Sequence, residues 1–286
     1  MHPLLARLNN KTTRTILRIV LFLLILFGVS LLLTVVVGFA IPHTFDEDQI
    51  DLYLSPAVSL AAAAVAHYVM LRAFDRRPWS AVGLGCSDAH PRLLGGGLLI
   101  GIAAIGIPSL LLLATSQLKL IPVGAGSSGT AAALGILTFL PAAFFEELMM
   151  RGYLFLVLRE AFGWKAALIF TSVTFGLLHM ANPNVDPESI ALVIMAGFFL
   201  GAVLLATGSL FATGMAHFGW NWVMGSLMHA SVSGIDVFSP DFRIVDNGPD
   251  WLTGGAWGPE GGLAAGVGMM ISFIYLYARR LRRMES

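Results

Sequence analysis

The chain has few charged residues and a single cysteine. Only 12% of its 286 residues are Asp, Glu, Lys or Arg, whereas soluble domains carry about 25%. This scarcity excludes a water-soluble fold. Because Cys86 is the one cysteine, the chain can form no internal disulfide and no metal site built from several cysteines. Any metal site would need His and carboxylate ligands.

A basic surplus is also missing. The formal net charge at pH 7 is zero, and nucleic-acid binding depends on a surplus of Lys and Arg. What the chain has in abundance is apolar residues, at 57%, with a mean hydropathy of +0.80. We therefore expect partners from the lipid bilayer and none among nucleic acids.

Long apolar stretches recur along the whole chain. A bilayer core about 30 Å thick needs roughly 20 apolar residues per helix. By this measure the sequence predicts an all-α, polytopic membrane bundle of about eight transmembrane helices. The expected spans are 16–41, 52–74, 93–115, 130–157, 164–181, 188–207, 209–231 and 262–279. The first is longer than the apolar region of a signal peptide, about 7 to 15 residues, so we expect it to be retained.

Basic residues mark one side of the predicted membrane protein. Cytoplasmic loops carry an excess of Lys and Arg, and most of the basic residues fall into the two termini and alternate loops. They are Arg7, Lys11, Arg14, Arg18, Arg72, Arg76, Arg77, Arg92, Arg159, Lys165, Arg279, Arg280, Arg282 and Arg283. The opposite loops include the acidic stretches 46–51 and 233–261. This pattern predicts a multi-pass protein of the plasma membrane with both termini in the cytoplasm.

Glycine pairs at four-residue spacing predict close helix packing. These pairs are Gly97 with Gly101, Gly197 with Gly201, and Gly262 with Gly266.

The polar residues described next divide the chain into three expected regions. Residues 1–129 form an N-terminal three-helix membrane region, 130–231 a catalytic helix core, and 232–286 an extracytoplasmic loop with the last helix.

Two adjacent carboxylates interrupt the fourth predicted span. An ionisable side chain inside a span costs a few kcal/mol, which makes it a candidate for a functional role. Glu147 and Arg151 are four residues apart and share one helix face, whereas Glu146 points about 100° away. Glu147 and Arg151 are therefore expected to pair and to support the helix. Glu146 has no partner on its own helix, so a polar group is expected to face it from another helix.

The fifth and seventh predicted spans supply such groups. His179 ends the stretch Phe175-Gly176-Leu177-Leu178-His179, and His217 is followed four residues later by Asn221, on the same helix face. Counting helical rise places His217 at about the depth of Glu146 and His179 nearer the far end. The sequence therefore predicts one site assembled from three helices.

The combination of Glu, two His and Asn favours hydrolysis of an acyl bond by activated water. Glu146 can act as general base, and His179 can share the water molecule. His217 and Asn221 can supply donors to the oxyanion of a tetrahedral intermediate. No Ser-His-Asp or Cys-His arrangement competes, because Cys86 falls in a predicted cytoplasmic loop.

At these residues the sequence resembles the CAAX protease and bacteriocin-processing family, also called the Abi family, of intramembrane glutamate-dependent endopeptidases. The family motifs are Glu-Glu-x-x-x-Arg, Phe-x-x-x-His and His-x-x-x-Asn or Asp, each on its own helix. Here they read Glu146-Glu147-Leu148-Met149-Met150-Arg151, Phe175-Gly176-Leu177-Leu178-His179 and His217-Phe218-Gly219-Trp220-Asn221. The resemblance covers about residues 130–231.

The resemblance implies an intramembrane protease with Glu146 as base, His179 sharing the water, and His217 with Asn221 stabilising the oxyanion. Family members cut after prenylated cysteines or act in peptide maturation, secretion or bacteriocin immunity, so the expected partner is a peptide or protein substrate at the membrane. The family is often labelled metalloprotease, and Glu146, His179 and His217 could bind Zn²⁺. Because a His-Glu-x-x-His motif is absent and Asn221 is a poor zinc ligand, we favour a metal-free mechanism.

Two other functions use the same residues. Intramembrane Glu and His side chains also form proton relays, so a proton-coupled carrier is an alternative. Carriers are often built from inverted repeats, and the Glu-Glu motif has no counterpart in the other half of the chain. A catalytically silent membrane scaffold that binds a partner's helix is the third possibility.

Overall fold

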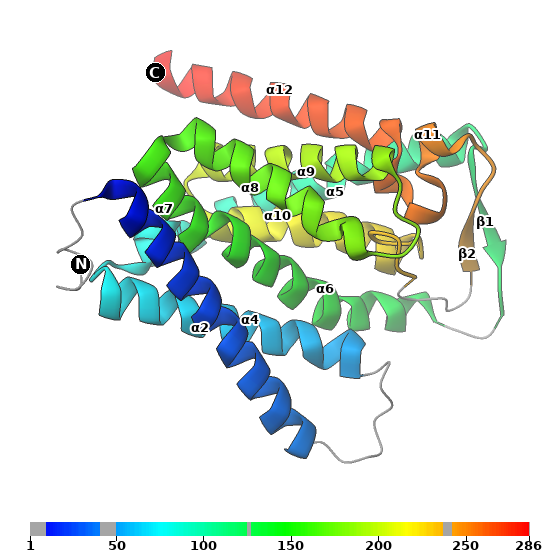
Figure 1. Cartoon of the computed structure of the whole chain (residues 1–286). Coiled ribbons are helices and arrows are strands. Elements are labelled where there is room, and N and C mark those ends of the chain that lie inside the picture. The colour runs from blue at the N-terminus through cyan, green and yellow to red at the C-terminus, as the bar shows by residue number, and fades with distance from the viewer. Residues whose placement is uncertain (1–9, 41–49, 125–126, 237–241, 286) are drawn as a thin grey trace.

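The structure is a computed structural model that describes residues 10–40, 50–124, 127–236 and 242–285. It is a bundle of helices, most of which run along one common direction (Figure 1). The main helices are α2 (Lys11–Ala40), α4 (Ser55–Tyr68), α5 (Pro91–Ala114), α6 (Ser128–Arg151), α7 (Tyr153–Phe162), α8 (Trp164–Leu178), α9 (Pro187–Thr207), α10 (Leu210–Trp222), α11 (Asp250–Thr253) and α12 (Leu263–Glu285). Short helical turns at Ile50–Leu54, Val69–Phe74, His179–Ala181 and Val223–Leu227 extend several of them.

Six helices in the described part of the chain are long and apolar enough to cross a membrane. They cover Lys11–Ala40, Leu52–Phe74, Pro91–Ala114, Ser128–Phe162, Trp164–Ala181 and Pro187–Thr207. A shorter apolar helix covers Leu263–Ala278. The prediction of a polytopic helical membrane bundle is confirmed, whereas the number eight is not.

The predicted span 209–231 differs most from the structure. Its helix, α10, has 13 residues and continues only through the turn Val223–Leu227. Most of α10 is buried, and it runs through the middle of the bundle (Figure 1). A helix surrounded by other helices need not match the thickness of the lipid core, because protein and not lipid covers its backbone.

Glycines bring α5 against this central helix. A Cβ atom on Gly97 or Gly101 would overlap the backbone of Ala212 or Ala216 on α10. The close packing predicted for Gly97 and Gly101 is therefore present. Because these glycines lack side chains, the backbone of α5 packs directly against the backbone of α10.

The other two glycine pairs have different outcomes. Gly197 and Gly201 on α9 lie against Ser172 and Leu168 of α8. Gly262, in contrast, precedes α12 and has an extended backbone, so its predicted pairing with Gly266 within one helix is wrong.

The predicted helix 130–157 is broken at Gly152, which separates α6 from α7. Gly152 lies against the ring of His67 on α4, and a Cβ atom there would collide with it. The backbone N–H of Tyr153 donates to His67 Nε2 at 3.0 Å. His67 thus satisfies an amide that the break would leave without a partner.

One end of the bundle is basic and holds both ends of the described chain. The start of α2 and the end of α12 lie at this end (Figure 1). Arg18 of α2 forms ion pairs there with Asp75, after α4, and with Glu160 of α7. The predicted topology has the same arrangement, with both termini on one side.

The opposite end carries a two-stranded antiparallel ribbon that the sequence did not predict. It pairs β1 (Leu118–Pro122) with β2 (Phe242–Asp246), so it joins the connection after α5 to the long connection after α10. The ribbon projects from the end of the helices (Figure 1). Residues 46–49 of the predicted acidic stretch, and Arg7 at the N-terminus, lie outside the described residues.

Candidate active site

A buried ion pair on α6 anchors the site. Arg151 Nη1 donates to Glu147 Oε1 at 3.1 Å, and both side chains are 0% exposed. Arg151 Nη2 also donates to the carbonyl of Gly197 on α9 at 2.9 Å. The predicted pairing of Glu147 with Arg151 is therefore present. Arg151 also connects α6 to α9 through its hydrogen bond to Gly197.

Glu147 has a second partner that helix spacing alone could not reveal. His217 Nδ1 lies 3.0 Å from Glu147 Oε1, where it can donate a hydrogen bond to the carboxylate. The Arg151–Glu147–His217 chain crosses from α6 to α10 in the bundle interior. Glu147 thereby fixes the orientation of the His217 ring, in the way that outer carboxylates orient functional histidines.

The other nitrogen of His217 faces Glu146. His217 Nε2 is 3.8 Å from Glu146 Oε2, so the polar group expected opposite Glu146 is this imidazole. The Glu146 side chain is 27% exposed, in contrast to the fully enclosed Glu147. The two adjacent carboxylates therefore have different environments: Glu147 is committed to a buried network, and Glu146 is accessible.

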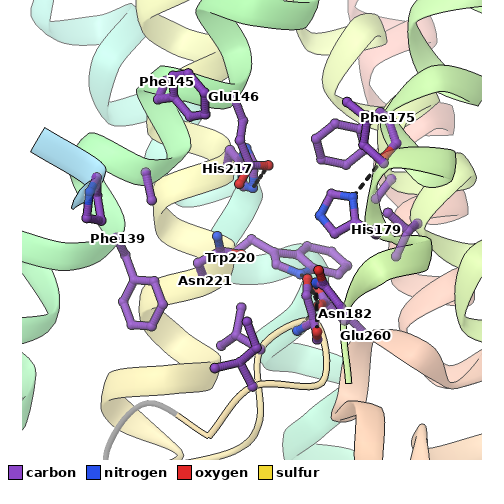
Figure 2. Close-up of a pocket in the computed structure, with 18 of the residues that line it drawn as sticks. Phe139, Phe145, Glu146, Phe175, His179, Asn182, His217, Trp220, Asn221 and Glu260 are labelled. Atoms are coloured by element: carbon purple, nitrogen blue, oxygen red, sulfur yellow. Dashed lines mark hydrogen bonds and ion pairs between the residues drawn. The ribbon is translucent and has the colours of Figure 1, made fainter. Parts of the chain in front are cut away.

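His179 lies at the end of α8, where the helix tightens into the turn His179–Ala181. Its Nδ1 lies 2.7 Å from the carbonyl oxygen of Phe175 and can donate to it. Its other ring nitrogen then carries the lone pair and points into the open space between α8 and α10 (Figure 2). Its position near the far end of the helix is the one that the helical rise indicated.

One cavity of about 930 Å³ connects these residues. Glu146, His179, His217 and Asn221 all line it, with Asn221 one helical turn beyond His217 (Figure 2). Much of the remaining wall is apolar, with Phe139, Phe145 and Phe199 among its members. The structure thus brings together all four residues that were predicted to be catalytic, and it leaves the two supporting residues, Glu147 and Arg151, behind the cavity wall.

Sequence reasoning missed a second carboxylate network in the same cavity. Glu260 Oε1 accepts hydrogen bonds from the N–H and the hydroxyl of Ser233, at 2.7 and 2.8 Å, and Oε2 accepts one from Trp220 Nε1 at 2.8 Å. Asn182 Nδ2 donates to the carbonyl of Ser233 at 3.0 Å. In the sequence, Glu260 is only an acidic residue just before an apolar run. Its partners Ser233 and Trp220 are distant along the chain, so residue spacing could not identify them.

Metal binding at the cavity was expected to need His and carboxylate side chains. Among the described residues, no three His, Cys, Asp or Glu side chains lie together in a way that could hold a metal ion. The preference for a metal-free mechanism over Zn²⁺ bound by Glu146, His179 and His217 therefore stays a prediction.

Fold and site together define a polytopic helical membrane protein with a carboxylate and two imidazoles around an internal cavity. Residues 128–223 match the family model described as type II CAAX prenyl endopeptidase Rce1-like. The matched residues contain all three motifs, and the match supports the resemblance of this part of the chain to the CAAX protease family. No curated protein and no solved structure matches the chain.

Proposed function

We propose that this protein is a glutamate-dependent intramembrane endopeptidase that cleaves peptide bonds of membrane-associated substrates with activated water. The observation that carries the proposal is the shared cavity of Glu146, His179, His217 and Asn221. Only the accessible member of the adjacent glutamates faces this cavity, and the buried one orients a histidine. A general base must be accessible to water, as Glu146 is, and a supporting residue must hold its neighbours in position, as Glu147 does for His217.

In this proposal each residue has one role. Glu146 takes a proton from water, and His179 holds the same water through the ring nitrogen that faces the cavity. The amide of Asn221 donates to the oxyanion, and His217 can donate from Nε2 when both ring nitrogens carry protons. Glu147 and Arg151 keep His217 and α6 in place.

The alternative functions predict different behaviour of one variant. A proton-coupled carrier with Glu146→Gln would lose proton flux, and a scaffold would keep partner binding. The protease loses cleavage while keeping its fold. Two measurements on purified wild-type and variant protein in liposomes distinguish the protease, the carrier and the scaffold. They are cleavage of a quenched fluorescent peptide and proton flux. Proton flux without cleavage would favour the carrier.

The proposed mechanism is metal-free, so cleavage is expected to survive prolonged treatment with a chelator. The physical reason is that a carboxylate and an imidazole can position water without a Lewis acid. The measurement compares the rate of peptide cleavage before and after treatment with EDTA or 1,10-phenanthroline. Loss of activity that returns on addition of Zn²⁺ would reverse this proposal.

We also propose that the basic end of the bundle faces the cytoplasm and that the protein resides in the plasma membrane. Cys86 tests the orientation, because it is exposed and lies in the connection before Arg92, at the basic end. A membrane-impermeant maleimide should leave Cys86 unlabelled in intact cells and label it once the membrane is opened. Efficient labelling of sealed cells would contradict this orientation.

A further inference from the structure

In the described part of the chain, the lining of the cavity extends to one end of the bundle. Beyond the cores of the helices, its lining comes from Leu52 and Pro56, from Asn182 after α8, and from the turn 232–236 after α10. All of these connections lie at the end that carries the β1–β2 ribbon. Ile235, with 48% of its surface exposed, and the exposed Asp236 form part of the wall at this end. We call this part of the cavity its mouth.

The basic end is closed. Arg151 and Tyr153 are 1% and 0% exposed and fill the interior beyond Glu146. The amide of Leu210 donates to the carbonyl of Gly83 at 2.9 Å. This hydrogen bond joins the start of α10 to the connection 75–90, which precedes α5. Among the described residues, none of those that line the cavity comes from the connections 75–90, 159–164 or 207–209. The described residues therefore leave no passage for a substrate to Glu146 from this end.

The described residues that line the mouth carry negative charge and include no basic side chain. The charged side chains that line the cavity, apart from the two histidines, are Glu146, Asp236 and Glu260, and no Lys or Arg lines its described wall. Glu260 is held by Ser233 and Trp220, whereas Asp236 is exposed and accepts the hydroxyl of Ser231, at 2.5 Å. A carboxylate at the rim of a cavity attracts cations and disfavours anions.

The geometry points to a substrate class: we infer that the cavity takes an extended peptide segment from the ribbon end, the extracytoplasmic side, with Lys or Arg beside an apolar stretch. The apolar residues would lie along Phe139, Phe145 and Phe199, and the basic residue would lie near Asp236. This inference rests on the proposed function for the cleavage step and on the proposed orientation for the side of the membrane.

The charge preference is tested with two quenched fluorescent peptides that differ only in Lys or Glu on one flank of an apolar core. Purified wild-type protein should cleave the Lys peptide with a higher kcat/KM, by about 2- to 5-fold as for an exposed ion pair, and added salt should reduce the difference. Asp236→Lys should reverse the order. Glu188→Lys makes the same charge change at an exposed position that does not line the cavity, and it should leave the order unchanged.

A thiol at the mouth tests the side of access without requiring cleavage. In a Cys86→Ser background, Ile235→Cys should react with an impermeant maleimide in intact cells. On purified protein, the Lys peptide should slow this reaction more than the Glu peptide does. Labelling of Ile235→Cys only after the membrane is opened would overturn access from the extracytoplasmic side.

The two assays also separate this inference from the proposed function. Equal cleavage and equal protection by the two peptides would overturn the substrate class and leave the protease proposal standing. Selective protection by the Lys peptide without any cleavage would support the substrate class and contradict the protease.

Discussion

Glu146→Gln is expected to abolish most cleavage while leaving the protein folded. The substitution keeps the shape of the side chain and removes the group that accepts a proton from water, so the rate should fall by about 10²- to 10⁴-fold. His179→Ala should be similarly severe. Asn221→Ala removes an oxyanion donor and should cost roughly 10²- to 10³-fold. Single-turnover rates on one reporter peptide, with each variant purified to the same oligomeric profile, give the comparison.

Glu188→Gln is the matched control for this series. Glu188 is exposed at the start of α9 and does not line the cavity. Its substitution by Gln should leave the rate within experimental error of the wild type. If folded Glu146→Gln protein cleaves at the wild-type rate, Glu146 is not the base, and the carrier or scaffold takes the place of the protease.

Arg151→Ala is expected to act through stability. Its removal leaves Glu147 as a buried carboxylate without its cation, which costs about 3 to 5 kcal/mol in the free energy of unfolding. The loss also reaches the site, because Glu147 orients His217. The midpoint of thermal unfolding in detergent should fall strongly, and the surviving folded fraction should also cleave more slowly.

Arg159→Ala provides the control, since Arg159 is exposed on α7. The loss of an exposed charge should change stability by less than about 1 kcal/mol. Equal melting temperatures for Arg151→Ala and the wild type would show that the buried ion pair contributes nothing to the stability of the fold. That result would contradict the supporting role proposed for Glu147.

Hydropathy predicted most of this fold, because long helices that face lipid must be apolar along their whole length. It failed where that reason does not apply. The central helix α10 is surrounded by protein, so its length is set by its neighbours. The break at Gly152 depends on His67 of α4, and the ribbon depends on pairing between β1 and β2. Such contacts between distant segments leave no periodic signal along the chain.

The candidate site could be predicted because its residues are costly in a membrane. Ionisable and amide groups inside apolar helices stand out without any structure. The hydrogen bond from His217 to Glu147 could not be predicted, because helical spacing relates only residues on one helix. Glu260 and Asp236 lie in a connection where acidic residues are common, so only the structure shows that they line the cavity.

The most direct test of the central claim is a digest of a diverse peptide library, in which mass spectrometry identifies new peptide termini made by purified protein in liposomes. The wild-type protein should generate a reproducible set of new termini, and Glu146→Gln protein, prepared identically and equally folded, should generate none of them. If the two digests show the same termini, or if neither contains any across the library, the chain does not hydrolyse peptide bonds through this glutamate.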